Sequence, residues 1–190
     1  ISPFVGRLDD YLRETAHIKF NRDDYFPEKG WKKGKKILDN NGIVSGVMLI
    51  KEISNLFIKQ KIKTKILAAS IRNSRQMREV ADNGADIINM SLEGPHSSTL
   101  QTAVKAAAQA GVILVAANGN SGANGISYPA AYDEVISVGA TRYDAALSYF
   151  SNYGTGMDLV APGGDIRVDQ NNDGYADGVL QQTIIMDNPN

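Results

Sequence analysis

The chain contains no cysteine and very little histidine or tryptophan. Its 190 residues include one Trp, two His (His17 and His96) and no Cys. The absence of Cys excludes a disulfide framework and a thiolate metal site, and it leaves the redox compartment undetermined. No apolar run approaches the roughly 18 residues that a membrane span needs, and Ile1–Val5 lacks the layout of a signal peptide. We expect a soluble protein with no membrane partner and assign it no localisation.

Basic residues are scarce in the second half of the chain. Residues 1–80 contain 17 Lys and Arg against 9 acidic residues, a net charge of +8, whereas residues 81–190 contain 3 against 12, a net charge of −9. Salt screens such charges beyond about 8 Å, so we expect a monomer or a weak charge-driven dimer. Residues 32–36 are rich in Lys, but Trp31 is the only aromatic residue beside them, so we expect no nucleic-acid partner.

Short strand-like runs alternate with helical patterns along most of the chain. The predicted strands are Ile1–Val5, Lys63–Ser70, Asp86–Ser91, Val112–Ala117, Val135–Ala140 and Asp158–Ala161. The predicted helices are Val44–Gln60, Ser74–Asn83 and Ser98–Ala110, and residues 8–43 are expected to form a long loop with one or two short helices. This alternation predicts a single three-layer α/β/α domain, flavodoxin-like or Rossmann-like, with a mostly parallel sheet of about six strands.

Two segments of the first half resemble strands of the transaldolase barrel. They are Ile1-Ser-Pro-Phe-Val-Gly-Arg7 and Ile66-Leu-Ala-Ala-Ser-Ile-Arg-Asn73, and the resemblance extends to about residue 85. It implies a phosphate or sulfate site formed by Arg7, Ser70 and Arg72, because guanidinium groups bind phosphate bidentately. The alternative is that the two arginines pair with Asp9 and Asp10. The Schiff-base lysine of that family would precede this chain, so aldol transfer is not expected.

The second half resembles subtilisin-like serine peptidases. The motifs that match, in the family's order, are 83–92 (NGADIINMSL), 115–122 (VAANGNSG), 128–132 (YPAAY), 135–141 (VISVGAT), 150–154 (FSNYG) and 159–163 (LVAPG). The resemblance implies that Asn120 is the asparagine whose side-chain amide helps to form the oxyanion hole. It also implies an acid and a base upstream and a nucleophilic serine downstream, and none of them is found in place within residues 1–190.

These two resemblances meet near residue 82, inside one helix-to-strand unit. We therefore expect one domain of two parts, 1–82 and 83–190, in an engineered or otherwise recombined chimera without catalytic activity. In this reading Asn120 is vestigial, His96 is a solvated loop residue, and Ser97 and Ser98 cap a helix. The alternatives are an anion-binding module through Arg7, Ser70 and Arg72, or residual serine peptidase or aldolase activity.

Oxygen-bearing side chains alternate in residues 169–177, in the pattern of a calcium loop. Hard cations need six to eight oxygen ligands, and the candidate ligands are Asp169, Asn171, Asp173, Tyr175 through its carbonyl and Asp177. Gly174 would provide the turn, while Leu180 stands where a bidentate acid is expected. The pattern makes Ca²⁺ the one cofactor we consider, and a solvated acidic hairpin is the alternative.

Overall fold

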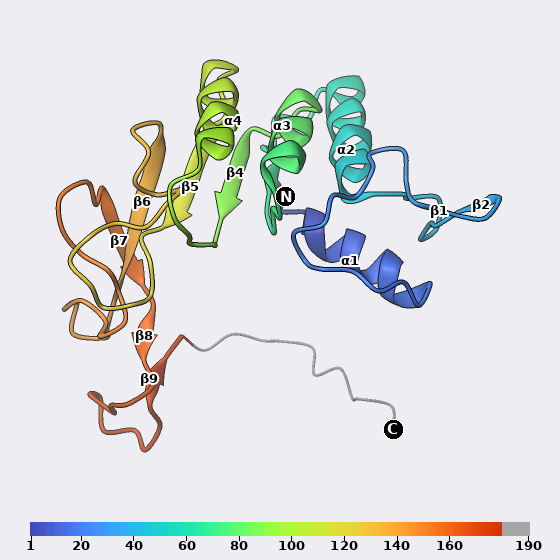
Figure 1. Ribbon diagram of the computed structural model, residues 1–190. Helices are drawn as coiled ribbons and strands as arrows, with labels where there is room; N and C mark the ends of the chain where they lie inside the picture. Colours follow the sequence, from blue (N-terminus) through green and yellow to red (C-terminus); the bar gives the residue numbers. More distant parts are fainter. Residues whose placement is uncertain (180–190) are drawn as a thin grey trace.

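The computed structural model describes residues 1–179 as a parallel sheet with helices packed against it (Figure 1). The helices are α1 (Val5–Thr15), α2 (Gly46–Gln60), α3 (Ser74–Asp82) and α4 (Ser98–Gln109). The strands are β1 (Lys32–Lys33), β2 (Lys36–Ile37), β3 (Leu67–Ala68), β4 (Ile87–Met90), β5 (Ile113–Ala117), β6 (Val135–Thr141), β7 (Leu159–Pro162), β8 (Gly164–Asp165) and β9 (Asp177–Gly178). The expected fold class, a three-layer α/β domain with a parallel sheet, is confirmed.

Five strands form the central sheet in the order β3-β4-β5-β6-β7, and all neighbours are parallel. Burial alternates along two of these strands. Ile88 and Met90 of β4 and Leu114 and Ala116 of β5 are buried, while the residues between them are only partly covered or exposed. At the far edge, all four residues of β7 are exposed. Because the strands are parallel, their carboxyl ends meet along one edge of the sheet.

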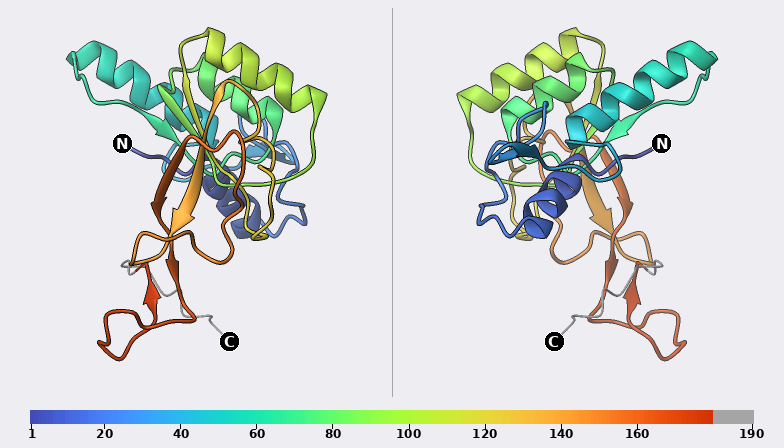
Figure 2. Two further views of the ribbon diagram at one scale, coloured as in Figure 1. Left: turned by 90° about the vertical axis from the view of Figure 1, so that its left-hand side faces the viewer. Right: turned by 90° about the vertical axis from the view of Figure 1, so that its right-hand side faces the viewer.

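Helices α2, α3 and α4 lie side by side in one row, and α4 contacts β5 (Figures 1 and 2). Each begins at a residue whose side chain accepts an amide hydrogen bond from the first turn: Ser45, Asn73 and Ser97. Such caps satisfy amide groups that the helix itself leaves unpaired. The apolar faces of these helices join the sheet in one core, which includes Val47, Met77 and Val104. No helix within residues 1–179 is long and apolar enough to cross a membrane.

The N-terminal segment departs from the expected strand and loop. Ile1 and Pro3 do accept hydrogen bonds from Leu67 N and Ala69 N, but a helix starts at Val5, so only an isolated bridge remains beside β3. The sheet therefore has five strands rather than six. The expected long loop contains the 11-residue helix α1 and a β1-β2 hairpin.

Arg13 at the end of α1 holds the loop that follows it. Its guanidinium donates to the carbonyl oxygens of Asp24 and Tyr25, and it faces three aromatic rings: Phe20, Phe26 and Trp31. A desolvated cation over aromatic faces is favourable, and the side chain is 1% exposed. Sequence alone gave no signal for this arrangement, because the four residues are distant along the chain.

Asp9 is a buried acid at the junction of α1, α2 and α3. Its side chain accepts hydrogen bonds from Gly46 N (2.7 Å) and from Gln76 Nε2 (2.7 Å), and the residue is 2% exposed. Burial raises the pKa of Asp9 to about 7, although the hydrogen bonds and the Arg13 charge oppose this. The native state therefore holds the Asp9 proton more tightly than the unfolded chain does.

We predict that Asp9 makes the free energy of unfolding fall as pH rises from about 4 to about 7. The raised pKa of Asp9 contributes its full stabilisation below the pKa that Asp9 has in the unfolded chain. This stabilisation, at most about 4 kcal/mol, is lost as pH rises through the pKa of Asp9 in the folded state. Urea unfolding of the wild type and of Asp9→Asn at pH 5 and pH 8 measures it. The variant should lose most of this pH dependence. An equal slope in both proteins, with exposed Asp82→Asn as the control, would contradict the assignment.

Candidate functional site

The candidate site is the loop Asn118–Ala123, which follows β5 at the carboxyl edge of the sheet. The loop leaves the sheet where Asn118 N donates to Val138 O of β6 (3.0 Å). Asn118 and Gly119 are buried, whereas Asn120 and Ser121 are exposed. The backbone thus turns outward at residue 120, and the Asn120 side chain is presented to solvent from a fixed base.

Asn152, in the connection between β6 and β7, fixes the loop from the side. Its Oδ1 accepts from Ser121 N (3.0 Å) and Ala123 N (3.2 Å), and its own backbone N donates to Gly119 O (3.1 Å). Asn118 Nδ2 in turn donates to Asn152 O. Asn152 is 3% exposed, so these bonds are shielded from competing water. One asparagine therefore holds the backbone on both sides of Asn120.

Two glycines allow this close approach. Gly119 has φ +118°, and a Cβ at this position would lie 2.2 Å from Asn152 Nδ2. Gly122 has φ +63°, and its Cβ would lie 2.5 Å from Tyr149 O. Both positions exclude L side chains on backbone conformation and on space. Gly119 is therefore required by the close approach of Asn152, and Gly122 by the close approach of Tyr149.

Asn120 combines a fixed backbone with a free side-chain amide. Its backbone N donates to Oε2 of Glu93 at 2.8 Å, from the segment that follows β4. Within residues 1–179 its side-chain amide makes no hydrogen bond with protein atoms. The fixed backbone sets where this amide projects, and its N–H groups are available to an oxyanion. The oxyanion-hole role that the sequence resemblance implies for Asn120 stays a prediction.

Aromatic residues pack behind this segment. The His96 ring lies edge-on to Tyr128 and Tyr132, with centroid distances of 5.1 and 5.8 Å. Tyr132 Oη donates to Ser97 O and accepts from Ser97 N, while the Ser97 side chain caps α4 as expected. Among residues 1–179 no serine hydroxyl is hydrogen-bonded to a histidine ring, since His96 Nε2 contacts Gln101 Oε1 at 3.4 Å. This cluster is therefore packing beside the loop.

In the predicted anion site the backbone segments of Arg7, Ser70 and Arg72 lie close together, but the two arginine side chains have other partners. Val5 N and Gly6 N donate to Ala69 O and Ser70 O, which places Arg7 near residues 70–72. Arg72 nevertheless pairs with Asp10 at 2.7 Å, as the alternative expected, and exposed Arg7 lies 5.9 Å from the Phe4 ring. Phosphate or sulfate binding by Arg7, Ser70 and Arg72 stays a prediction.

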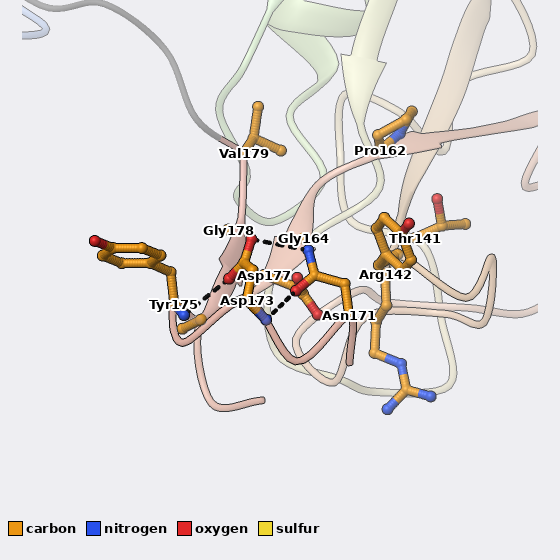
Figure 3. A pocket seen from close by; sticks show the side chains of 12 residues that line it. Thr141, Arg142, Pro162, Gly164, Asn171, Asp173, Tyr175, Asp177, Gly178 and Val179 are labelled. Carbon is orange, nitrogen blue, oxygen red and sulfur yellow. Dashed lines mark hydrogen bonds between the residues drawn. The ribbon is translucent and has the colours of Figure 1, made fainter. Parts of the chain in front are cut away.

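The predicted calcium loop lies beside a hollow of about 880 Å³ between β8, β9 and the end of β6 (Figure 3). Asp173 N donates to Oδ1 of both Asp169 (3.2 Å) and Asn171 (2.9 Å), so these two oxygens face the same point. Asp177 also turns toward the start of the loop, because its Oδ2 accepts from Gln170 N. The Tyr175 ring points away from these groups (Figure 3).

The oxygen donors of this loop fit a hard cation only in part. An ionised carboxylate that accepts an amide hydrogen bond keeps lone pairs for a cation. Among residues 1–179, however, no three His, Cys, Asp or Glu side chains are grouped to hold a metal ion, so a site would depend on Asn171, backbone oxygens and water. Leu180, expected at the twelfth loop position, lies outside the described residues.

Comparison with known proteins identifies the family of this chain. The model of the subtilase family of peptidases (Peptidase_S8) matches residues 37–189. The chain belongs to the subtilase family. Subtilisin BL of Lederbergia lenta is 38% identical over 129 residues, which cover 67% of this chain and 47% of that protein. The thermophilic serine proteinase of Bacillus sp. (strain AK1) is 49% identical over 87 residues, which cover 45% of this chain and 22% of that protein.

These subtilases are considerably longer than the stretch that matches. The chain spans less than half the length of either relative. Among solved structures, the psychrophilic subtilisin-like protease Apa1 of Pseudoalteromonas sp. AS-11 is 35% identical with a TM-score of 0.45, covering 50% of this chain and 22% of that chain.

The expectation of a chimera without catalytic activity is wrong. The subtilase match spans residues 37–189, which include residue 82, and relatives named as subtilisins are 38–43% identical over 109–129 residues. The family match therefore lies on both sides of the expected junction, and one of the relatives is named a serine proteinase. The resemblance to transaldolases is not shown for residues 1–85.

Sequence reasoning found Asn120 but missed the residues that position it. Asn152 stands in the quoted motif 150–154 (FSNYG), and Glu93 directly follows the motif 83–92, yet neither was given a role. The only signal for Asn152 in the sequence was its place inside that motif. Nothing in the sequence indicated that Glu93 would meet Asn120, 27 positions away.

Proposed function

We propose that this subtilase chain forms part of a serine peptidase that cleaves peptide bonds by acyl transfer. The observation that supports the proposal best is the free side-chain amide of Asn120 on a loop that Asn152 holds rigid. In acyl transfer the carbonyl oxygen of the substrate gains negative charge as the nucleophile adds. A preorganised amide donor stabilises that charge more than it stabilises the ground state.

The described residues supply the oxyanion side of this chemistry. Asn120 would donate its Nδ2–H to the developing oxyanion, while Asn152, Asn118 and the glycines of the loop keep the donor in place. Because Asn118 and Asn152 are buried, water does not compete for the hydrogen bonds with which they hold the loop. Covalent labelling identifies the serine that attacks. The similarity to proteins named as subtilisins is the reason to expect such a serine.

We predict that a fluorophosphonate probe labels one serine of the protein that contains this chain, and peptide mapping by mass spectrometry identifies it. Asn120→Ala should lower the second-order labelling rate about 10²- to 10³-fold, because the phosphonyl oxygen loses its amide donor. Gln109→Ala, which removes an exposed amide at the end of α4, is the matched control and should label at the wild-type rate.

Labelling no stronger than that of the heat-denatured protein would overturn the proposed function. Equal labelling rates for Asn120→Ala and Gln109→Ala would instead remove Asn120 from the oxyanion role. A circular dichroism melt of each variant shows whether a lost rate reflects a lost fold.

We further propose that the 169–177 loop binds Ca²⁺ and stabilises the β8-β9 hairpin. The support is the convergence of Asp169 and Asn171 oxygens on one amide and the inward turn of Asp177. Asp177 N donates to Val168 O (2.8 Å), so the two ends of the 169–177 loop are already close. A cation would offset the repulsion among Asp169, Asp173 and Asp177.

We predict that millimolar Ca²⁺ raises the melting temperature, by the equivalent of about 2.7 kcal/mol at one hundred times the Kd. Differential scanning calorimetry of the chain with and without Ca²⁺ measures this. Asp173→Asn should abolish most of the shift, whereas Asp133→Asn, outside the loop, should keep it. No shift in the wild type at millimolar Ca²⁺ would sink the proposal.

A further inference from the structure

Glu93 places an uncompensated carboxylate beside the oxyanion donor. Its Oε2 accepts from Asn120 N at 2.8 Å, and the residue is exposed. The ion pairs formed among residues 1–179 do not include Glu93, so no Lys, Arg or His of the described chain lies within 4 Å of it. Its negative charge is therefore open to a charge from outside this part of the chain.

The loop does not need Glu93 to keep its shape. Asn152 already binds Ser121 N, Ala123 N and Gly119 O, and Gly122 N donates to Phe150 O at 2.7 Å. Nor does Glu93 cap the following helix, since Ser97 performs that role for α4. A purely structural role would be served equally by a neutral acceptor. The charge of the carboxylate adds a further consequence.

That consequence is electrostatic. A carboxylate near Asn120 repels the negative charge that forms on the substrate oxygen during acyl transfer. An acid at this position is unfavourable for the reaction unless a cation neutralises it when substrate binds. A cation on the substrate removes the repulsion and gains an ion pair at the same time.

We propose that Glu93 selects peptide substrates with a basic side chain, Arg or Lys, next to the scissile bond. The inference rests on the proposed peptidase function and names its substrate class. One Glu93 oxygen is occupied by Asn120 N, and the other can accept from a guanidinium or an ammonium group. There is space beside it, because a Cβ built on Gly94 meets no atom within 4 Å.

Binding of two amino-acid amides tests this selection without requiring catalysis. N-acetyl-arginine amide and N-acetyl-citrulline amide have nearly the same shape and differ in charge. We expect the arginine amide to bind about threefold or more tightly, as for an exposed ion pair, in an NMR titration that follows the Asn120 backbone amide. Glu93→Gln keeps an acceptor for Asn120 N and removes the charge, so it should abolish the difference. Glu52→Gln, an exposed acid on α2, should retain it.

Two outcomes would overturn the selection: equal affinity of the two amides for the wild type, or the same arginine preference in Glu93→Gln. These results are separable from the fate of the proposed function. A protein that reacts with the fluorophosphonate and shows no arginine preference overturns the selection alone. A protein that prefers arginine at Glu93 but never reacts with the fluorophosphonate overturns the peptidase function alone.

Discussion

The candidate site depends on the side-chain amide and backbone of one buried residue, Asn152. Its Oδ1 accepts two amide hydrogen bonds from the loop after β5, and its backbone groups bind Gly119 and Asn118. A buried polar network of this kind is rigid when it is fully satisfied and costly when one member is missing. Glycine at 119 and 122 allows positive φ values there, close to the Asn152 side chain and to Tyr149 O respectively. Everything inferred about Asn120 follows from that constraint.

The parallel sheet explains why residues distant in sequence share this site. Chain segments that leave β4 and β5 emerge at the same edge, since neighbouring parallel strands end together. Glu93 therefore meets Asn120, and Asn152 reaches the same edge from the connection between β6 and β7. Glu93 and an oxyanion are both negative, so in the proposed selection a cationic substrate side chain is favoured beside them. In the proposed function, this edge of the sheet brings a donor for the reaction beside a group for selectivity.

Local sequence patterns predicted the elements far better than the contacts between them. The short strand-like runs Asp86–Ser91 and Val112–Ala117 predicted β4 and β5, and Ser97 before an apolar-periodic run predicted the start of α4. Ile1–Val5 was predicted as a strand because it is apolar, but burial of Val5 and Asp9 against α2 favours a helix there. Asn120 was found through a family motif. Asn152 and Glu93 were not, because a polar residue in a loop reveals its partner only when the backbone is folded.

The central claim is that the side-chain amide of Asn120 donates a hydrogen bond to the oxyanion that forms during acyl transfer. A crystal structure of the protein after reaction with a peptidyl fluorophosphonate tests it most directly. The account predicts that the phosphonyl oxygen lies about 2.7–3.1 Å from Asn120 Nδ2, with the Asn152 contacts to Ser121 and Ala123 intact. A phosphonyl oxygen bound elsewhere, with the Asn120 amide still facing solvent, would contradict it.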